Sequence, residues 1–340
     1  MNKLLITGGA GFIGSNAALV FAQSGWNVTI LDNFSRKGAE ANIAWLRERA
    51  SVSIVRVDIR NLPEFEKVFA HTQFDVVLHL AAQVAVTTSV VNPREDFDIN
   101  AAGTLNLLEC LRRLQPQAQL IYASTNKVYG RMEHVGVVER NGRYEYESLA
   151  QGAGEEQALD FHSPYGCSKG AADQYVLDYA RIYGLRTTCF RQSCIYGPRQ
   201  FGVEDQGWVA WFIIASVLNK NITIYGDGKQ IRDLLHVHDL VGAYEAAIAN
   251  PDKCSGQAFN IGGGPKNTLS LLELVSMLKT GLQKEIPLTF DTWRPGDQPV
   301  FVCNVQKARQ QLSWEPKIGV EEGVDGLIAW VKENKNLFTQ

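Results

Sequence analysis

The chain has 340 residues, of which 45% are hydrophobic and 20% charged, which suits a folded protein with one large α/β unit and a smaller one. Its formal net charge of −3 gives no reason to expect nucleic acid or a membrane as a partner. An anionic ligand would therefore have to meet a few well-placed Arg or Lys side chains.

The six cysteines are scattered, without a C-x-x-C pair or a His/Cys cluster, which argues against a metal site and against a disulfide scaffold. The sequence shows no secretory signal before its first expected strand. Its longest strongly apolar stretch, residues 208–218, is far shorter than the ~20 residues that cross a bilayer. We therefore expect a cytoplasmic protein with reduced thiols.

The first half alternates short β-branched runs with longer helical patterns, which is typical of βαβ units and a parallel sheet. Several of the runs are apolar throughout, as expected when helices cover both faces of a sheet. Strands are expected at residues 4–7, 28–32, 53–58, 76–80, 120–124 and 187–191. The helices between them are expected to start near residues 11, 40, 62, 93 and 163.

Residues 130–160 interrupt this alternation, because they show no clear period and exceed the length of most connections. This insertion is either a lid over a site or a solvated surface insertion. The chain after residue 191 is less regular. Helices near residues 207–219, 239–249 and 269–280, with strands at 222–225 and 258–261, predict a smaller α+β lobe over residues 192–340 that crosses back to the first domain.

A glycine-rich segment, residues 7–14, joins the first expected strand to the first expected helix. Its pattern is both G-x-x-G-x-x-G and G-x-G-x-x-G, which lets the backbone turn tightly and approach a pyrophosphate at a helix N-terminus. An acidic residue, Asp32, follows about 20 residues later, as in dinucleotide-binding units. Residues 1–191 are therefore predicted to be a Rossmann-type NAD-binding domain with a doubly wound parallel sheet.

Two acidic residues refine the prediction of the cofactor. Asp32 would accept hydrogen bonds from the adenosine ribose and repel a 2′-phosphate, which favours NAD over NADP. Arg36 and Lys37 follow it, either to hold a phosphate or, as we favour, as solvated loop charges. Asp58, at the end of the third expected strand, either approaches the adenine amino group or caps the next helix.

The segment 163–169 predicts the start of a helix, with Ser163 as its N-cap and a proline in the first turn. Tyr165 and Lys169 lie four residues apart, so they share one helical face. A phenol is a weak base at neutral pH, and we expect the neighbouring ammonium to lower the pKa of Tyr165. Together with the glycine-rich start, this pair predicts dehydrogenase chemistry.

Hydroxyl and small residues end two further strands. Ser124 and Thr125 follow the fifth strand, where a hydroxyl can bond the oxygen that Tyr165 deprotonates. After the fourth strand, residues 80–82 leave room for the nicotinamide-side ribose and Gln83 is expected to point at the substrate. His79 is interpreted as a packed strand residue. The predicted cofactor set is Gly8, Gly11, Phe12, Ile13, Gly14, Asp32, Asn33, Asp58, Ile59, Leu80, Ala81, Ala82, Asn100, Ser124, Tyr165 and Lys169.

These residues resemble the extended short-chain dehydrogenase/reductase family, over nearly the whole chain. Within it, the segments 124–130, 159–175, 199–201, 205–209 and 228–233 resemble the CDP-tyvelose (CDP-paratose) 2-epimerases. The resemblance implies inversion at C2 of a CDP-linked hexose with bound NAD. It also implies a homodimer or homotetramer, built by the helices that start near residues 93 and 163.

The resemblance assigns roles residue by residue. Tyr165 is implied as the base, Lys169 as its partner and ribose anchor, and Thr125 as the hydroxyl that orients the sugar. Arg232 and Arg294 match positions that hold the substrate diphosphate, which suits the planar fork of Arg. The full substrate set is Gln83, Thr125, Asn126, Gln192, Cys194, Arg199, Gln206, Arg232 and Arg294.

The chain departs from the wider family at two places. Many relatives carry Asn where this chain has Cys194, so one substrate hydrogen bond is in doubt. The 4,6-dehydratases carry an acidic pair directly after the Thr, and here Asn126 and Lys127 stand there. A 4,6-dehydratase, a 4-epimerase and a non-catalytic NAD-binding regulator remain as alternatives.

Overall fold

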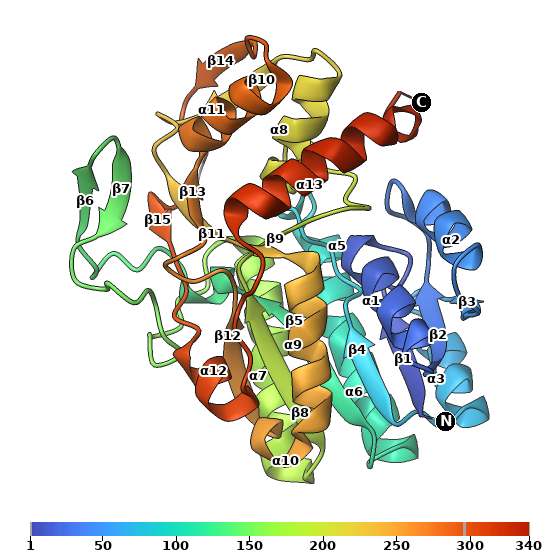
Figure 1. Cartoon of the computed structure of the whole chain (residues 1–340). Helices are drawn as coiled ribbons and strands as arrows, with labels where there is room; N and C mark the ends of the chain where they lie inside the picture. Colours follow the sequence, from blue (N-terminus) through green and yellow to red (C-terminus); the bar gives the residue numbers. More distant parts are fainter. Residues whose placement is uncertain (1, 295–296, 340) are drawn as a thin grey trace.

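The computed structural model describes residues 2–294 and 297–339 of the chain. Its centre is a seven-stranded sheet with the order β12-β8-β5-β4-β1-β2-β3, in which every neighbouring pair is parallel (Figure 1). The strand order reverses between β1 and β4, which is the topological switch point where doubly wound sheets bind ligands. The expectation of a Rossmann-type α/β fold is confirmed.

The strands of the large sheet are β1 (Lys3–Thr7), β2 (Asn27–Asp32), β3 (Ser53–Arg56), β4 (Val76–His79), β5 (Gln119–Thr125), β8 (Arg186–Gln192) and β12 (Gln257–Ile261). The smaller strands are β6 (Val137–Arg140), β7 (Arg143–Tyr146), β9 (Cys194–Tyr196), β10 (Ile222–Tyr225), β11 (Ile231–His236), β13 (Thr268–Ser270), β14 (Leu288–Asp291) and β15 (Val300–Phe301). The helices are α1 (Phe12–Gln23), α2 (Ala39–Arg47), α3 (Leu62–His71), α4 (Val86–Val91), α5 (Pro93–Phe97), α6 (Gly103–Leu114), α7 (Ser163–Tyr183), α8 (Trp208–Val217), α9 (Val237–Ala249), α10 (Pro251–Cys254), α11 (Leu271–Leu282), α12 (Gln306–Leu312) and α13 (Val320–Glu333), with short turns η1 (Asp98–Ala102), η2 (Asn126–Tyr129) and η3 (Lys335–Leu337).

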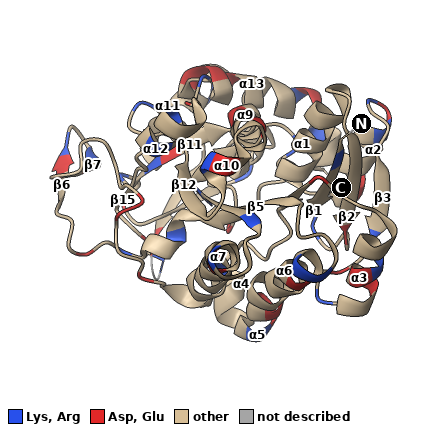
Figure 2. Ribbon diagram, turned by 90° about the horizontal axis from the view of Figure 1, so that it is seen from below, with Lys and Arg blue, Asp and Glu red and all other residues tan. Residues whose placement is uncertain are grey.

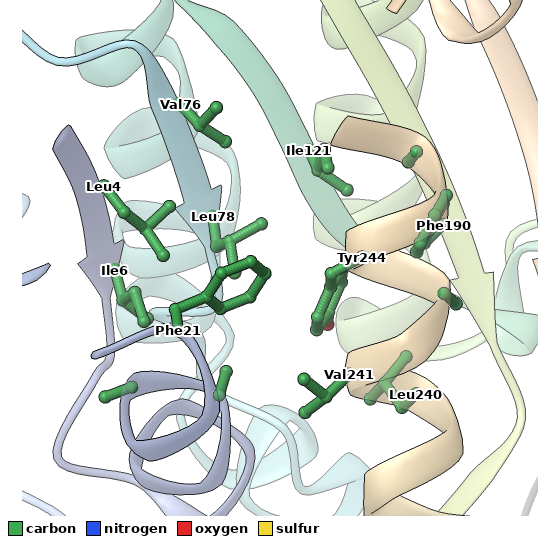
Figure 3. Packing of buried hydrophobic residues seen from close by; sticks show 14 of the residues in the cluster. Leu4, Ile6, Phe21, Val76, Leu78, Ile121, Phe190, Leu240, Val241 and Tyr244 are labelled. Carbon is green, nitrogen blue, oxygen red and sulfur yellow. The ribbon is translucent and has the colours of Figure 1, made fainter. Parts of the chain in front are cut away.

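Helices cover both faces of the large sheet, because its strands carry apolar side chains on both faces. Leu4, Ile6 and Leu78 face α1 and α9, where Phe21 and Tyr244 pack against them (Figure 3). The neighbours of these strand residues along the chain face the other way, toward α3, α6 and α7. The core therefore fixes the strand ends as a rigid edge on which functional side chains can stand.

The segment between β4 and β5 differs from the single helix expected to start near residue 93. It forms α4, α5, a π turn at η1 and α6 in succession. Asn92 ends α4, and its side chain caps α5 by accepting a hydrogen bond from Glu95 N–H. Pro93 explains the break, because it has no N–H to continue the preceding helix.

The C-terminal part forms a second lobe with its own core around α8, α11 and α13. Its chain also returns to the first domain, because β12 pairs with β8 at the edge of the large sheet and α9 and α12 cover that sheet. In Figure 2 the acidic and basic residues are interspersed along the helices. Within residues 2–294 and 297–339, no helix is both long and apolar enough to cross a membrane.

The insertion at 130–160 forms the β6–β7 hairpin, which projects from the side of the molecule (Figure 1). Tyr144 donates a hydrogen bond from its hydroxyl to Asp227 at 2.6 Å, and Arg143 pairs with Glu273 at 3.2 Å. Ala153 pairs with Cys303 as an isolated bridge. The insertion is therefore anchored to the C-terminal lobe.

Candidate active site

A pocket of about 410 Å³ lies at the carboxyl ends of the strands of the large sheet. It runs from the glycine-rich turn and the end of β2 to Tyr165 and Lys169 on α7. Its wall contains every residue of the predicted cofactor set except Asn100. The sequence motifs therefore converge on one place, which is the switch point of the sheet.

The glycine-rich turn is a cradle in which side chains do not fit. A Cβ on Gly8 would lie 2.7 Å from the Ala81 nitrogen, and one on Gly14 would lie 2.5 Å from the Gly8 oxygen. Helix α1 begins directly after this turn, at Phe12, so its first N–H groups have no partner within the helix. Such a turn suits a pyrophosphate, which needs close backbone approach and a positive helix end.

Asp32 lies at the end of β2, and its carboxylate bonds both the glycine-rich turn and the segment that follows β2. One oxygen accepts from Ala10 N–H at 3.0 Å and the other from Phe34 N–H at 2.8 Å. Burial raises its pKa, against these two hydrogen bonds, which lower it. The carboxylate is thus held in place on the pocket wall, with lone pairs left for ribose hydroxyls.

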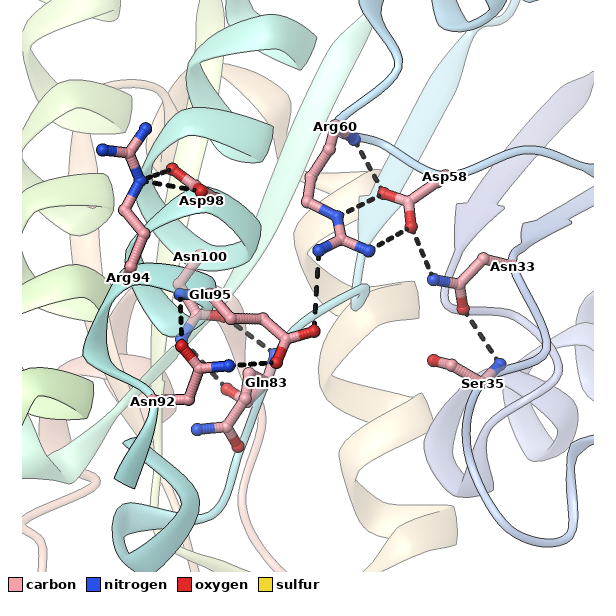
Figure 4. Close-up of polar contacts among 10 residues, drawn as sticks. All are labelled: Asn33, Ser35, Asp58, Arg60, Gln83, Asn92, Arg94, Glu95, Asp98 and Asn100. Atoms are coloured by element: carbon pink, nitrogen blue, oxygen red, sulfur yellow. Dashed lines mark hydrogen bonds and ion pairs between the residues drawn. The ribbon is translucent and has the colours of Figure 1, made fainter. Parts of the chain in front are cut away.

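Asp58 does not cap the next helix, which corrects one of its two expected roles. The cap of α3 is Asn61, whose side chain accepts from Glu64 N–H. Asp58 instead accepts from Asn33 at 2.8 Å and from Arg60 at 2.8 Å, as Figure 4 shows. The hydrogen bonds of Arg60 are the main reason that the pKa of Asp58 falls to about 2, so Asp58 is an ionised, oriented acceptor on the pocket wall.

Tyr165 lies in the first turn of α7, whose N-cap is His162 and not Ser163 as expected. Ser163 is the first residue of the helix, and its side chain accepts a hydrogen bond from Gly166 N–H at 3.2 Å. The Tyr165 N–H donates to the Ser89 hydroxyl of α4 at 3.1 Å. Burial raises the pKa of the phenol to about 12, whereas the Thr125 side chain lowers it. Thr125 therefore lies where a hydroxyl partner of the base is needed.

Lys169 does not act on Tyr165 as expected. Its ammonium donates to the Ala123 carbonyl at 2.6 Å and lies 4.2 Å from the centre of the Tyr122 ring. Burial lowers the pKa of Lys169 to about 7. The charge that lowers the pKa of Tyr165 comes instead from Arg36. The expected direct effect of the ammonium on the phenol is therefore not found in this structure.

Gln83 and Asn100 are corrected from ligand contacts to supports of the site. The Gln83 side chain bonds Ala85 and donates to Asp96 at 2.9 Å, and the pocket wall does not include it. The Asn100 side chain is occupied by Gln83 O at 3.0 Å and Asp96 at 3.1 Å. Asp96 also accepts from Ser168, so this buried network ties α5 and η1 to the catalytic helix.

The residues expected on the substrate side form two groups. In the first, Arg232 pairs with Asp297 at 2.6 Å, and the charge of Lys127 acts on the same carboxyl group. Cys194 lies near Arg232 and Lys127, and burial raises the pKa of its thiol. Asn126 accepts from the Thr125 hydroxyl at 3.3 Å, which connects this group to the end of β5.

The second group lies on the turn at residues 203–206. Arg294 pairs with Asp205 at 3.0 Å and lies 3.9 Å above the Tyr225 ring. Gln206 lines the pocket and accepts a hydrogen bond from Arg36. Arg36 is exposed, as expected of a loop charge, and it also lines the pocket, where it bonds Gln206.

Gln192 and Arg199 are two further residues expected to contact the substrate, and their side chains have different partners within the protein. Gln192 lines the pocket, and its amide donates to Tyr244 at 2.8 Å. Arg199 also reaches the wall, but its guanidinium donates to Asn42 at 2.9 Å and to Ala41 O at 2.7 Å. Arg199 thus links α2 to the second lobe, and its expected substrate contact stays a prediction.

Sequence reasoning missed some members of the site. Ile99 and Val84 line the pocket, but isolated apolar residues carry no signal in a sequence. Asp173 bonds Ser124 from the inner side, and its position four residues after Lys169 on the same helical face was available as a signal. No cluster of His, Cys, Asp or Glu that could hold a metal occurs in the part of the chain that the structure describes.

Comparison with known proteins gives a consistent picture. The family model described as GDP-mannose 4,6 dehydratase matches residues 5–327. A CDP-paratose 2-epimerase from Salmonella typhi is 47% identical over 96% of this chain and 98% of its own length. The chain belongs to the extended short-chain dehydrogenase/reductase family of NAD-dependent nucleotide-sugar epimerases and dehydratases.

Solved structures of this family share the fold. A UDP-glucose 4-epimerase from Thermotoga maritima, solved with UDP-glucose, has a TM-score of 0.85 and 30% identity, covering 98% of this chain and 99% of that one. A dTDP-glucose 4,6-dehydratase from Bacillus anthracis, in complex with NAD, has a TM-score of 0.81 and 28% identity, covering 99% of this chain and 98% of that one. The glycine cradle and Asp32 of this chain fit the same cofactor.

Proposed function

We propose that this chain is a CDP-sugar 2-epimerase that inverts C2 of a CDP-linked hexose, of the type that converts CDP-paratose to CDP-tyvelose. The observation that carries the proposal is the end of β5, where Asn126 and Lys127 follow Thr125 beside the catalytic tyrosine. A dehydratase needs an acid there to eliminate water, and neither residue is a carboxylic acid. The similarity to the Salmonella typhi CDP-paratose 2-epimerase supports C2 as the carbon and CDP as the nucleotide.

The proposed division of labour follows the two lobes. Residues 1–191 bind NAD, and residues 192–340 contribute most of the substrate side, with β12 returning to the large sheet. The pyrophosphate of NAD is held by the turn at residues 8–14 and the adenosine ribose by Asp32. Arg232 and Arg294 hold the diphosphate of the substrate by their planar forks.

The chemistry needs one base and one redox partner. NAD, held by the turn at residues 8–14 and by Asp32, would supply the hydride acceptor and donor for C2 when bound. Tyr165 removes the proton of the C2 hydroxyl, and Thr125 orients that oxygen by a hydrogen bond. The pKa of Tyr165, about 12 through burial, must fall for this step, and the Thr125 hydrogen bond and the charge of Arg36 both lower it.

Inversion requires that the 2-keto sugar shows its other face before it is reduced. The sugar turns about its bond to the diphosphate, while Arg232 and Arg294 keep that diphosphate in place. The pocket must hold the ketone and exclude water through this turn. The hydrogen bond between Arg36 and Gln206, which both line the pocket, is suited to that requirement.

Incubation of the purified protein with CDP-paratose, without added NAD, tests the proposal directly. NMR of the product should show inversion at C2 alone. Inversion at C4 of a UDP-hexose would favour the 4-epimerase alternative, and loss of water from a nucleotide-linked glucose would favour the dehydratase. Absence of any turnover across these substrates would favour a non-catalytic NAD-binding regulator.

We propose a homodimer through α4, α5 and α7. These helices lie together on one side of the molecule and expose large apolar residues, which is unusual for a surface that faces only water (Figure 2). The exposed fractions are 86% for Val91, 52% for Phe97 and 62% for Ile182. Val91→Asp should give a monomer by light scattering, and a tetramer in the wild type would require a second interface.

We also propose that the protein works in the cytoplasm. All six cysteines are free thiols in the structure, and four of them, Cys110, Cys189, Cys254 and Cys303, are buried in the core. A reducing compartment suits such a set. Fractionation of the source cells, followed by detection of the protein, tests this location.

A further inference from the structure

Behind the pocket, α7 and β8 share a fully buried ion pair. Arg191 donates to Asp173 through two nitrogens, at 2.9 and 3.1 Å, and the two side chains are 5% and 0% exposed. A buried pair of this kind adds little net stability compared with apolar packing. Its presence in a well-packed core therefore indicates a role other than stability.

Asp173 connects the pair to the active site. The Ser124 hydroxyl donates to Asp173 at 2.7 Å, and Ser124 lies on the pocket wall at the end of β5. Because its one proton is committed to the carboxylate, the Ser124 oxygen presents only lone pairs to a ligand. Asp173 also follows Lys169 by four residues on α7, so the two side chains share one face of the helix.

On the far side, the pair is fixed by a chain of polar groups that does not touch the pocket. Arg191 donates to the Tyr129 hydroxyl at 3.2 Å, and that hydroxyl donates to Asn260 at 2.7 Å. Asn260 in turn bonds Ala153 O in the insertion at 2.9 Å. Because Arg191 is held from behind, the carboxylate that it grips has a fixed position.

We propose that Asp173 is a positioning residue of the active site: it fixes the Ser124 hydroxyl as a hydrogen-bond acceptor on the pocket wall and places a negative charge one helical turn from the Lys169 ammonium. This inference rests on the proposed function, since Ser124 and Lys169 belong to its active site. Asp173 acts through these two residues and is itself hidden from ligands.

The surroundings of Lys169 show why such a charge matters. Burial lowers the pKa of Lys169, and the Asp173 charge is the largest effect that raises it again. A neutral Lys169 would lose its charge-assisted hydrogen bond to the Ala123 carbonyl at the end of β5, so the cation must be maintained in a buried place. The other groups that face the ammonium are Cys189 on β8, Asp96 on α5, the neutral His79 on β4 and the Tyr122 ring on β5.

The test is a carbon-13 NMR titration of lysine-labelled, full-length protein with NAD bound. The Lys169 resonance is identified by its absence from Lys169→Arg. Asp173→Asn should move the Lys169 midpoint to lower pH by about one pH unit or more, as expected for loss of a charge one turn away. Tyr179→Phe, which removes a hydroxyl that bonds Glu109 from the same helix, is the matched control and should titrate like the wild type.

Two further variants keep the test decisive. If Asp173→Asn does not fold, the double variant Asp173→Asn with Arg191→Gln removes both buried charges and should show the same fall. Asp173→Glu should restore the wild-type midpoint. An unchanged midpoint in whichever of the two neutral variants folds would overturn the proposal.

The same variants should also move the alkaline limb of the kcat profile to lower pH, with little change in KM. The NMR titration needs no sugar turnover, so it distinguishes failure of this proposal from failure of the proposed function. A wild-type protein that is inactive on CDP-sugars, yet shows the shifted Lys169 titration, would refute only the function.

Discussion

The cofactor side and the substrate side of the pocket are built in different ways. The cofactor side uses backbone geometry from one short segment, residues 8–14, together with acidic residues at the ends of two neighbouring strands. The proposed substrate side brings together Lys127, Cys194, Arg232 and Asp297 from four separate segments, outside the residues that line the pocket. Chemistry common to a family can therefore rest on a contiguous motif, whereas the choice of substrate depends on how distant segments meet.

The reaction centre lies between the two sides and should show the largest effect. Tyr165→Phe should lower kcat on the order of 10²–10⁴-fold, because it removes the base, while bound NAD is retained. Tyr179→Phe is a matched control on the same helix, since that hydroxyl bonds Glu109 away from the pocket. Turnover measured by NMR and NAD measured after denaturation check both parts. A Tyr165→Phe protein with near wild-type kcat would remove Tyr165 from the mechanism.

The cofactor side should be intolerant of a single added methyl group. Gly14→Ala places a Cβ 2.5 Å from both the Gly8 oxygen and the Gly9 Cα, so the cradle must distort. Overpacking of about 1–3 kcal/mol corresponds to NAD binding weaker by up to about 100-fold. Gly326→Ala in α13 is the control, because nothing lies within 4 Å of its Cβ. Calorimetric titration with NAD that gives equal affinities for the two variants would contradict the cradle.

The substrate side should show a loss of binding without a loss of chemistry. Arg232→Gln should raise KM for the CDP-sugar by about 10-fold or somewhat more, the effect of one charge-assisted hydrogen bond, with a small change in kcat. Arg309→Gln, which breaks an exposed ion pair with Glu315, should leave both constants unchanged. A fall in kcat with unchanged KM would place Arg232 in the chemical step instead.

The smallest expected effect is a dependence of stability on pH, to which one buried histidine in each lobe contributes. Burial lowers the pKa of His79 in the large sheet to about 3 and that of His236 in the second lobe to about 4. Each is neutral when folded and takes up a proton below about pH 6.5 when unfolded, so stability is full above that pH and declines below it. At about pH 5.5 each histidine should cost about 1.4 kcal/mol relative to neutral pH. Urea unfolding should show this decline, and His236→Gln should make it less steep; an equal slope in that variant would contradict the assignment.

The sequence predicted the cofactor side well because its signals are local. The three-residue spacing of Gly8, Gly11 and Gly14, the position of Asp32 and the pairing of Tyr165 with Lys169 each follow from one turn or one helix. The same reasoning failed for Gln83, whose side chain lies outside the pocket wall and donates to Asp96 on another element. It also failed for the pKa of Tyr165, because burial and the approach of Arg36 are properties of the folded chain.

The central claim is that one carbon, C2, is oxidised and then re-reduced within a single closed pocket. The measurement that tests it most directly is NMR of CDP-paratose converted by the purified protein in D2O without added cofactor. The account predicts inversion at C2 with no deuterium at that carbon, because the hydride returns from the cofactor. Deuterium at C2 of the product would contradict it, since that result requires removal of the C2 proton to solvent.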